Sequence, residues 1–159
     1  MVDKFEIRLA VPDDIYAIAD VYADSIRELC KHDYEPEVIA LWEVSTAPES
    51  RLIAIENGSL WVAEVNGNIG GYLVAVPGEL VALFVASSYA GLGMGKALGQ
   101  LGIEISKQDN SGVVILESTI TAAPFYKKLG FEEVSRGFFS HGSSDIKIPV
   151  INMALTTCS

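Results

Sequence analysis

Three glycines on alternate positions, Gly91, Gly93 and Gly95, separate a strand-like segment from a helix-like one. The preceding residues 79–86 read ELVALFVA, which is typical of a strand, and residues 94–105 carry an apolar stripe at helical spacing. Glycine weakens a helix start unless the backbone needs an unusual angle or a ligand must come close. A helix start also presents unpaired N–H groups and a partial positive charge, so this unit predicts a phosphate-binding loop.

Patterns elsewhere in the chain predict an α+β fold with a central sheet of about seven strands. Besides residues 79–86, strand patterns occur at residues 4–10, 59–65, 69–76, 112–118, 131–139 and 146–155. Helical patterns occur at residues 11–30, 35–45, 48–57 and 122–130. Asp13 or Asp14 can cap the first of these helices. The NGN sequence at residues 66–68 is typical of a hairpin, and the continuous apolar run at residues 112–118 predicts a buried strand.

The composition fits a single folded domain covering residues 1–159. Half of the residues are apolar and a fifth are charged, which provides enough apolar material for a core. The first residues lack the apolar stretch of a signal peptide, and the longest uncharged run, residues 80–95, is too short to span a bilayer. We therefore expect a cytoplasmic protein that does not bind membranes. The net charge of −10 also argues against nucleic acid as a partner.

The two cysteines, Cys30 and Cys158, predict neither a disulfide nor a metal centre. One falls in an expected helix and the other is next to last in the chain. His32 lies two residues after Cys30, but a metal site needs further ligands, and the sequence has one other histidine, His141. We therefore expect no bound metal.

Acidic residues are concentrated in residues 13–49. This segment holds ten Asp and Glu residues against Arg27 and Lys31, so it carries −8 of the net charge of −10. Two interpretations remain open. The acids can form solvated helix faces, or they can produce a field that attracts a cationic substrate.

Two familiar phosphate-binding motifs do not fit the glycine loop. A P-loop requires glycine five residues before Gly95 and Ser or Thr after Lys96, but Ala90 and Ala97 occupy these positions. A dinucleotide-binding fingerprint requires a G-x-G-x-x-G pattern near the first strand of a βαβ unit. The glycines here have a G-x-G-x-G pattern and follow the fourth expected strand.

The segment LFVASSYAGLGMGKAL, residues 83–98, resembles the coenzyme-binding strand, loop and helix of the GCN5-related N-acetyltransferases, the GNAT family. The family pattern has Arg or Gln, two further residues, Gly, one residue, and then Gly or Ala. Gly93 and Gly95 match the two small positions, whereas Ala90 stands at the first position. The order of the expected elements also agrees with this family.

Two further segments strengthen the resemblance. STITAAPFYKKLGFEEV, residues 118–134, resembles the family's late helix, which carries a tyrosine before LGF. Tyr126 matches that tyrosine, and Thr121 stands where many members have Asn. Residues 34–42 resemble the acceptor-side helix of a poorly characterised bacterial branch of the family.

The resemblance implies acetyl-CoA as cosubstrate, bound without a metal. The glycine loop and the helix dipole would hold its pyrophosphate through the main chain of Gly91, Leu92, Gly93, Met94, Gly95 and Lys96. Leu83, Phe84 and Val85 would pair with the pantetheine arm as an added strand would, and Thr121 is the last implied coenzyme contact. In this family the sheet is splayed between its fourth and fifth strands, here residues 79–86 and 112–118, and the thioester would lie in that gap.

The resemblance also implies direct acetyl transfer to an amine in a ternary complex. An amine is mostly protonated at neutral pH and must lose a proton before it attacks. Glu79 and Glu117 are candidate bases because each lies on one of the splayed strands, although either can be an ordinary acid at a strand end. Tyr126, at the catalytic tyrosine position of the family, can protonate the departing thiolate, or it can be a core tyrosine.

Two functions follow as hypotheses. The first is an N-acetyltransferase acting on a primary amine, either a small cationic amine or a protein lysine or amino terminus. The second is a non-catalytic acyl-CoA-binding or regulatory module on the same fold, which Ala90 favours and Tyr126 opposes. The sequence leaves open the identity of the acceptor and the choice between a monomer and a homodimer.

Overall fold

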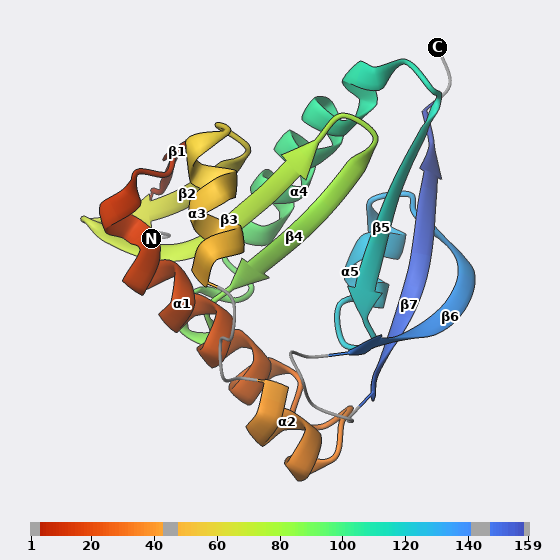
Figure 1. Cartoon of the computed structure of the whole chain (residues 1–159), viewed down its shortest axis with the longest axis horizontal. Coiled ribbons are helices and arrows are strands. Elements are labelled where there is room, and N and C mark those ends of the chain that lie inside the picture. The colour runs from red at the N-terminus through yellow and green to blue at the C-terminus, as the bar shows by residue number, and fades with distance from the viewer. Residues whose placement is uncertain (1–3, 43–47, 141–146, 158–159) are drawn as a thin grey trace.

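The computed structural model describes residues 4–42, 48–140 and 147–157, and its centre is a seven-stranded sheet (Figure 1). In the order in which they lie in the sheet, the strands are β1 (Glu6–Leu9), β2 (Leu60–Val65), β3 (Asn68–Val76), β4 (Glu79–Val85), β5 (Val113–Thr119), β7 (Lys147–Thr156) and β6 (Glu132–Ser140). β4 and β5 are parallel, and the other neighbours are antiparallel. The predicted α+β class and mixed, mostly antiparallel sheet are confirmed. His141 and Cys158 of the sequence analysis lie outside the described residues, as does Glu43, one of the ten acids of residues 13–49.

Helices cover both faces of this sheet. They are α1 (Ile15–Asp24), α2 (Pro36–Trp42), α3 (Pro48–Glu56), α4 (Met94–Ser106) and α5 (Ala123–Lys128). α1 and α3 pack on one face of β2, β3 and β4, while α4 packs on the other face and α5 lies on the α4 side (Figure 1). A core cluster lies on each face, one around Ile18 and Tyr72 and the other around Leu98 and Met153. None of these described helices is long and apolar enough to cross a membrane.

Local sequence signals explain the hairpin of β2 and β3. Asn66 and Gly67 have φ values of +52° and +83°, and this conformation in a two-residue loop matches the twist of the flanking strands. β3 then pairs with β4 so that Tyr72 lies opposite Phe84. The rings of Tyr72 and Phe84 are stacked with centroids 5.5 Å apart, and both belong to the site described below.

The helix predicted over residues 11–30 is divided into three kinds of turn. Pro12–Asp14 form a 3-10 turn, α1 follows, and Ser25–Leu29 form a wider π-helical turn. Asp14 is the N-cap residue of α1, but its side chain caps the preceding 3-10 turn, as part of a capping box with Val11, and makes no cap hydrogen bond to α1.

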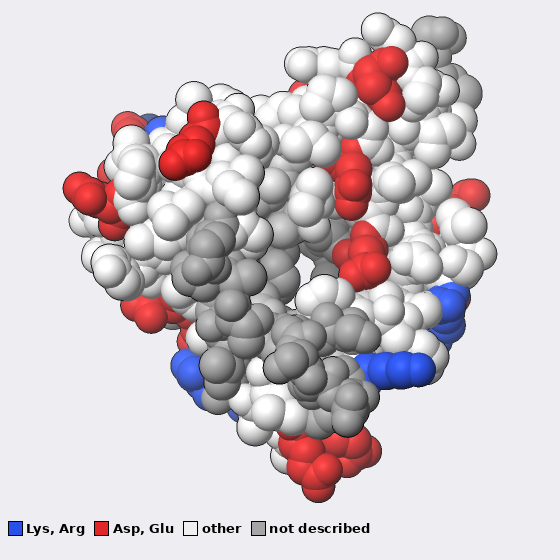
Figure 2. All heavy atoms as spheres, viewed as in Figure 1, with Lys and Arg blue, Asp and Glu red and all other residues white. Residues whose placement is uncertain are grey.

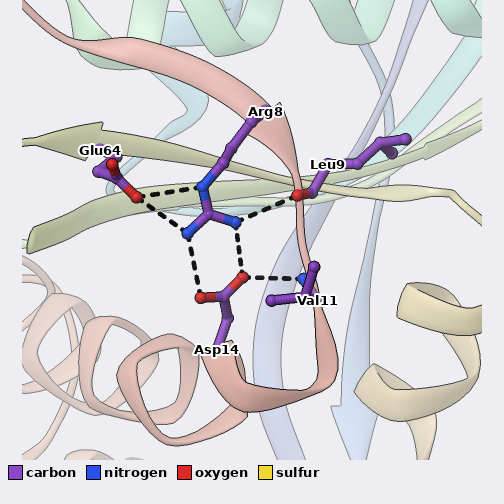
Figure 3. Close-up of polar contacts among 5 residues, drawn as sticks. All are labelled: Arg8, Leu9, Val11, Asp14 and Glu64. Atoms are coloured by element: carbon purple, nitrogen blue, oxygen red, sulfur yellow. Dashed lines mark hydrogen bonds and ion pairs between the residues drawn. The ribbon is translucent and has the colours of Figure 1, made fainter. Parts of the chain in front are cut away.

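The Asp14 carboxylate instead belongs to a polar network that joins α1 to the sheet (Figure 3). It accepts hydrogen bonds from the Val11 N–H and, at 2.8 and 3.1 Å, from the guanidinium of Arg8. Arg8 on β1 also binds Glu64 on β2. One arginine therefore fastens the start of α1 to two strands.

β5 is buried on one face only, which corrects the buried strand predicted for residues 112–118. Val114 and Leu116 are buried, whereas Val113 and Ile115 are 40% and 51% exposed. The physical reason is the position of the helices, because α1 and α3 make their main contacts with β2, β3 and β4. The corresponding face of β5 is left without such cover.

The sheet opens between β4 and β5, as predicted. In the described chain, β4 and β5 are paired at one position, where Glu79 lies beside Ile115. Next to this pair, the Ile115 N–H donates a 3.1 Å hydrogen bond to the Gly78 carbonyl oxygen. The two strands start side by side and diverge toward their carboxyl ends (Figure 1). The far half of β4 therefore has an edge that β5 does not pair.

Candidate active site

The glycine loop between β4 and α4 leaves its backbone open. Gly91 and Gly93 have φ values of +80° and +86°, which other residues adopt only at a cost. A Cβ atom built on either glycine would meet no other atom within 4 Å. Gly93 is the N-cap of α4, and no side chain caps that helix start. The first N–H groups of α4 are therefore available to an anion, which fits the pyrophosphate of coenzyme A.

Asp24 anchors this loop to the end of α1. Its carboxylate accepts hydrogen bonds from the backbone N–H and the hydroxyl of Ser87, at 2.6 and 3.2 Å. Ser87 begins the 3-10 turn Ser87–Tyr89, which leads into the glycines. The position of the glycine loop thus depends on a member of the acid-rich segment.

A cavity of about 470 Å³, here called the glycine-loop cavity, lies beside this loop. Eight of the ten predicted coenzyme-binding residues line it: Leu83, Phe84, Val85, Gly91, Gly93, Gly95, Lys96 and Thr121. Leu92 and Met94 are not among its lining residues. The Met94 side chain is 1% exposed and packs in the core on the α4 side, so its contribution to the loop is limited to its main chain. Leu92 is 42% exposed.

The π-helical turn supplies lining residues that the sequence analysis missed. Ser25 and Leu29 of this turn, and Cys30 directly after it, line the glycine-loop cavity. Widened turns of this kind are frequent at functional sites, but nothing in the sequence separates them from an ordinary helix. Cys30 is a buried free thiol, and burial raises its pKa. Tyr89, Ala122 and Phe125 also line the cavity without having been predicted.

Tyr126 lies at the opening between β4 and β5. It lines a small cavity of about 50 Å³ together with residues 80–84 of β4 and 117–119 of β5. Its side chain is 5% exposed and meets the rings of Phe125 and Phe131 edge-on. No residue in the described part of the chain hydrogen-bonds its hydroxyl. Burial raises the pKa of Tyr126 above its ordinary value, so the hydroxyl stays protonated at neutral pH.

Glu79 and Glu117 lie on the two strands that form this opening. Glu79 is aligned with Ile115 where the strands pair, and Glu117 follows two residues later. Partial burial and the nearby charge of Glu79 raise the pKa of Glu117, although its side chain still reaches solvent. Glu117 lines the small cavity with Tyr126, and Glu79 does not. The structure therefore brings Glu117 and Tyr126 to one cavity and leaves Glu79 as a neighbouring charge.

A third cavity, of about 340 Å³, lies on the face of the sheet that carries α1 and α3. We call it the aromatic cavity because five elements contribute a ring to its lining: Tyr22, Trp42, Tyr72, Phe84 and Phe139. Glu117 is the one carboxylate among its described lining residues. Figure 2 views this face and shows it hollowed between the helical part and the β5–β7 part, with acidic side chains on the β5 side of the hollow.

Phe84 lines all three cavities. The small cavity shares Leu83 and Ala122 with the glycine-loop cavity, and it shares Val81 and Glu117 with the aromatic cavity. The three cavities therefore adjoin at the opening in the sheet, with the glycine loop at one end and the aromatic cavity at the other.

The acidic residues of the segment 13–49 lie outside the aromatic cavity, as far as the structure describes them. Asp14, Asp24 and Asp33 instead accept hydrogen bonds from other parts of the chain. Within the described ranges, no group of three or more His, Cys, Asp or Glu side chains is arranged to hold a metal ion.

A comparison with models of protein families identifies the family that has this fold. Residues 30–156 match the family model of the acetyltransferase (GNAT) domain. The chain belongs to the GNAT acetyltransferase family. The resemblance seen in residues 83–98 and 118–134 is thereby confirmed, and by class this GNAT protein is an acetyl-CoA-dependent N-acetyltransferase.

Other GNAT proteins resemble the chain over most of its length. The uncharacterised N-acetyltransferase YafP of Escherichia coli is 24% identical over 135 residues, which cover 84% of this chain and 85% of that protein. The crystal structure of a GCN5-related N-acetyltransferase from Rhodopseudomonas palustris has a TM-score of 0.86 at 21% identity and 98% coverage of both chains. The PaiA N-acetyltransferase of Thermoplasma acidophilum, solved in complex with coenzyme A, has a TM-score of 0.73 at 21% identity, covering 96% of this chain and 99% of that one. These structures share the GNAT fold with this chain.

Proposed function

We propose that this GNAT protein transfers the acetyl group of acetyl-CoA to a primary amine while both substrates are bound. The observation that carries the proposal is the meeting of the glycine-loop and aromatic cavities at the opening between β4 and β5, where Phe84 lines both. Two molecules in these cavities would approach each other at the opening. Such an arrangement favours direct transfer, because it converts an encounter in solution into a reaction between held groups.

Two features of the chain suit coenzyme A. The open N–H groups at the start of α4 can bind its pyrophosphate, and Lys96 in the first turn adds a positive charge. Leu83–Val85 have main-chain groups on the edge that β5 leaves unpaired, and the pantetheine arm can bind there as an added strand. When bound, acetyl-CoA supplies the activated acetyl group as a thioester. The coenzyme A bound to the PaiA protein, which has a similar fold, supports this assignment.

Glu117 is the base of this proposal. A primary ammonium has a reference pKa of about 10.4, so the acceptor arrives charged at neutral pH. The Glu117 carboxylate lines both the aromatic and the small cavity, where it can take a proton from that nitrogen. Burial and Glu79 raise the pKa of Glu117, which makes its carboxylate a stronger base. In this proposal Glu79 does not take the proton itself, and its negative charge acts by raising the pKa of Glu117.

Tyr126 is the acid of this proposal. It lines the small cavity, and its raised pKa keeps the hydroxyl protonated. The hydroxyl has no partner among the described residues, so it can donate to a departing thiolate without first giving up another hydrogen bond. Contacts with Phe125 and Phe131 hold the ring in place.

Initial-rate kinetics test the proposal. Thiol release from acetyl-CoA is measured while the concentrations of acetyl-CoA and of amines from several classes are varied. We expect amine-dependent thiol release and intersecting double-reciprocal plots, as transfer within a ternary complex requires. If acetyl-CoA raises the melting temperature but no amine accelerates thiol release, the chain is a non-catalytic acyl-CoA-binding module.

A matched pair of glycine variants tests the coenzyme site. Gly93 and Gly58 have φ values of +86° and +71°, and a Cβ on either would meet no atom within 4 Å. Gly93→Val and Gly58→Val should therefore carry similar backbone penalties, but the first adds its side chain at the glycine-loop cavity. Coenzyme A at a hundredfold excess over Kd should stabilise the native chain and Gly58→Val by about 2.7 kcal/mol, and Gly93→Val much less. Equal stabilisation of the two variants would contradict this site.

A further inference from the structure

Fixed aromatic rings form much of the aromatic cavity. Tyr72 and Phe84 are stacked, and Tyr22 meets Phe84 edge-on with centroids 5.2 Å apart. Tyr22, Trp42 and Tyr72 are each less than a tenth exposed, so their rings are held by packing on the sides that do not face the cavity. Phe84 and Phe139 are more exposed than these three rings, and their surface gains free energy when an apolar group displaces water from it.

The charges of the cavity lie on different elements. Glu117 on β5 also lines the small cavity with Tyr126. Arg51 on α3 places its guanidinium 4.7 Å from the centre of the Tyr22 ring on α1. An ammonium group is attracted by the Glu117 carboxylate. The nitrogen of an amine therefore turns toward the opening in the sheet, and the rest of the molecule extends along the rings.

We infer that the acceptor is a small primary monoamine whose nitrogen is joined to an apolar body about the size of an aromatic ring, such as an arylalkylamine. This inference rests on the proposed function and names the substrate class of the same site. The volume of about 340 Å³ lies within the range of small-molecule sites. The rings cover the apolar body, and Glu117 receives the charged end.

Other classes of amine match this lining less well. The lining also contains Ser50, Arg51 and Thr119, but the hydroxyls of an amino sugar that lie against the aromatic rings would lose hydration without gaining a partner there. The second ammonium of a polyamine would need a second carboxylate, whereas the described lining supplies Glu117 alone. A protein lysine would enter as a thin methylene chain and leave much of the ring surface uncovered.

A panel of four amines tests the substrate class: 2-phenylethylamine, glucosamine, spermidine and a short lysine peptide, each with acetyl-CoA. We expect kcat/KM for 2-phenylethylamine to exceed each of the others by about tenfold or more, because pocket contacts of this kind change specificity by such factors. A higher kcat/KM for any of the other three amines overturns the inference and leaves acetyl transfer standing. If none of the four accelerates thiol release, the proposed function itself fails.

Val81 and Val113 provide a matched pair of variants. Both lie on strands and are 44% and 40% exposed, but Val81 lines the aromatic cavity and Val113 does not. Val81→Asp should lower kcat/KM for 2-phenylethylamine by about tenfold, because it places a charge against the apolar body. Val113→Asp should leave kcat/KM unchanged, and melting temperatures check that both variants fold. Equal losses in the two variants would overturn the assignment of the acceptor to this cavity.

Trp42 gives a readout that does not depend on turnover. The chain has two tryptophans, so Trp61→Phe leaves Trp42, which lines the aromatic cavity, as the single fluorophore of this type. In this variant, 2-phenylethylamine should change the tryptophan fluorescence in a saturable way, and glucosamine at the same concentration should not. Turnover of 2-phenylethylamine with no change in Trp42 fluorescence would overturn the inference.

Discussion

The hydroxyl of Tyr34 donates a hydrogen bond to the carbonyl oxygen of Pro149 across 2.6 Å. The same hydroxyl accepts a hydrogen bond from the N–H of Ile120 at 2.9 Å. Tyr34 precedes α2, Pro149 is on β7, and Ile120 follows β5. One side chain therefore joins the helical part of the molecule to β7 and to the segment that follows β5, both beyond the opening in the sheet. It also fixes the segment between β5 and α5, on which the position of Tyr126 depends.

Loss of this hydroxyl should weaken the fold. We expect Tyr34→Phe to reduce the free energy of unfolding by about 1–3 kcal/mol, because the Ile120 N–H and the Pro149 carbonyl oxygen lose a partner in a site shielded from water. Urea unfolding measures the loss. Tyr16→Phe is the control, since Tyr16 is 81% exposed and should contribute little through its hydroxyl. Equal stabilities of the two variants would show that the Tyr34 hydrogen bonds are replaced by water without cost.

Tyr126→Phe keeps the ring and removes the proton that the side chain can give. Because no described residue hydrogen-bonds this hydroxyl, we expect little change in melting temperature. Positioned general acids contribute about 10²–10⁴-fold, so kcat should fall by a factor in that range while coenzyme A still raises the melting temperature. A kcat close to that of the native chain would return Tyr126 to a packing role. A large loss of stability would show instead that the hydroxyl has a structural partner.

The pH profile of kcat/KM tests the assignment of Glu117 as the base. A base must be ionised to accept a proton, so activity should rise with pH through the pKa of Glu117. Burial and Glu79 raise that pKa above the ordinary value, which is about 4.3. Glu79→Gln removes the neighbouring charge and should move the acid limb to lower pH. Glu117→Gln should abolish the limb and lower kcat/KM by about 10²–10⁴-fold. If Glu79→Gln causes the larger loss, the two residues have exchanged roles.

The Arg8–Asp14 pair should make stability depend on pH (Figure 3). Hydrogen bonds from Arg8 hold the pKa of Asp14 below its ordinary value. A carboxyl of this kind adds stability that is complete above its unfolded pKa, about 3.9, and is lost as the pH falls through the folded value. Asp14→Asn should therefore cost about 1–2 kcal/mol at neutral pH, with a difference that shrinks below about pH 4.

Urea unfolding at several pH values measures this difference. Asp13→Asn is the control, because Asp13 is the exposed neighbour of Asp14. If the loss in the free energy of unfolding caused by Asp14→Asn stays constant as the pH falls, the loss comes from altered hydrogen-bond geometry and not from the charge of Asp14.

The helices and strands could be predicted because apolar residues recur at the spacing of the face that each element buries against the rest of the protein. The Asn66-Gly67 turn and the buried positions Met94 and Leu98 of α4 agree with their patterns. Exposure of Val113 and Ile115 could not be predicted, since an apolar run does not reveal whether a helix covers it. The opening between β4 and β5 came from the family resemblance, because strand patterns alone do not state which strands pair.

The part of the site that offers main-chain N–H groups, the glycine loop, could be predicted from the sequence. Gly91 and Gly93 occupy a conformation that favours glycine, so the sequence marks their positions. The aromatic cavity carries no such mark. Tyr22 and Phe139 line it from opposite ends of the chain, and tertiary packing alone brings them together. The separate roles proposed for Glu79 and Glu117 likewise depend on which of them lines the small cavity.

The limited pairing of β4 with β5 bears on how the molecule opens in solution. Those amides of Leu83–Val85 that face β5 have no partner strand there, so their hydrogen exchange should be fast in the free protein. The β2–β3 and β5–β7 ladders have long registers and should exchange slowly, as two separate units. A ligand that pairs with the free edge of β4 would slow exchange along that edge and make the two units unfold together. The coenzyme would then serve, for as long as it stays bound, as a temporary eighth strand of the sheet.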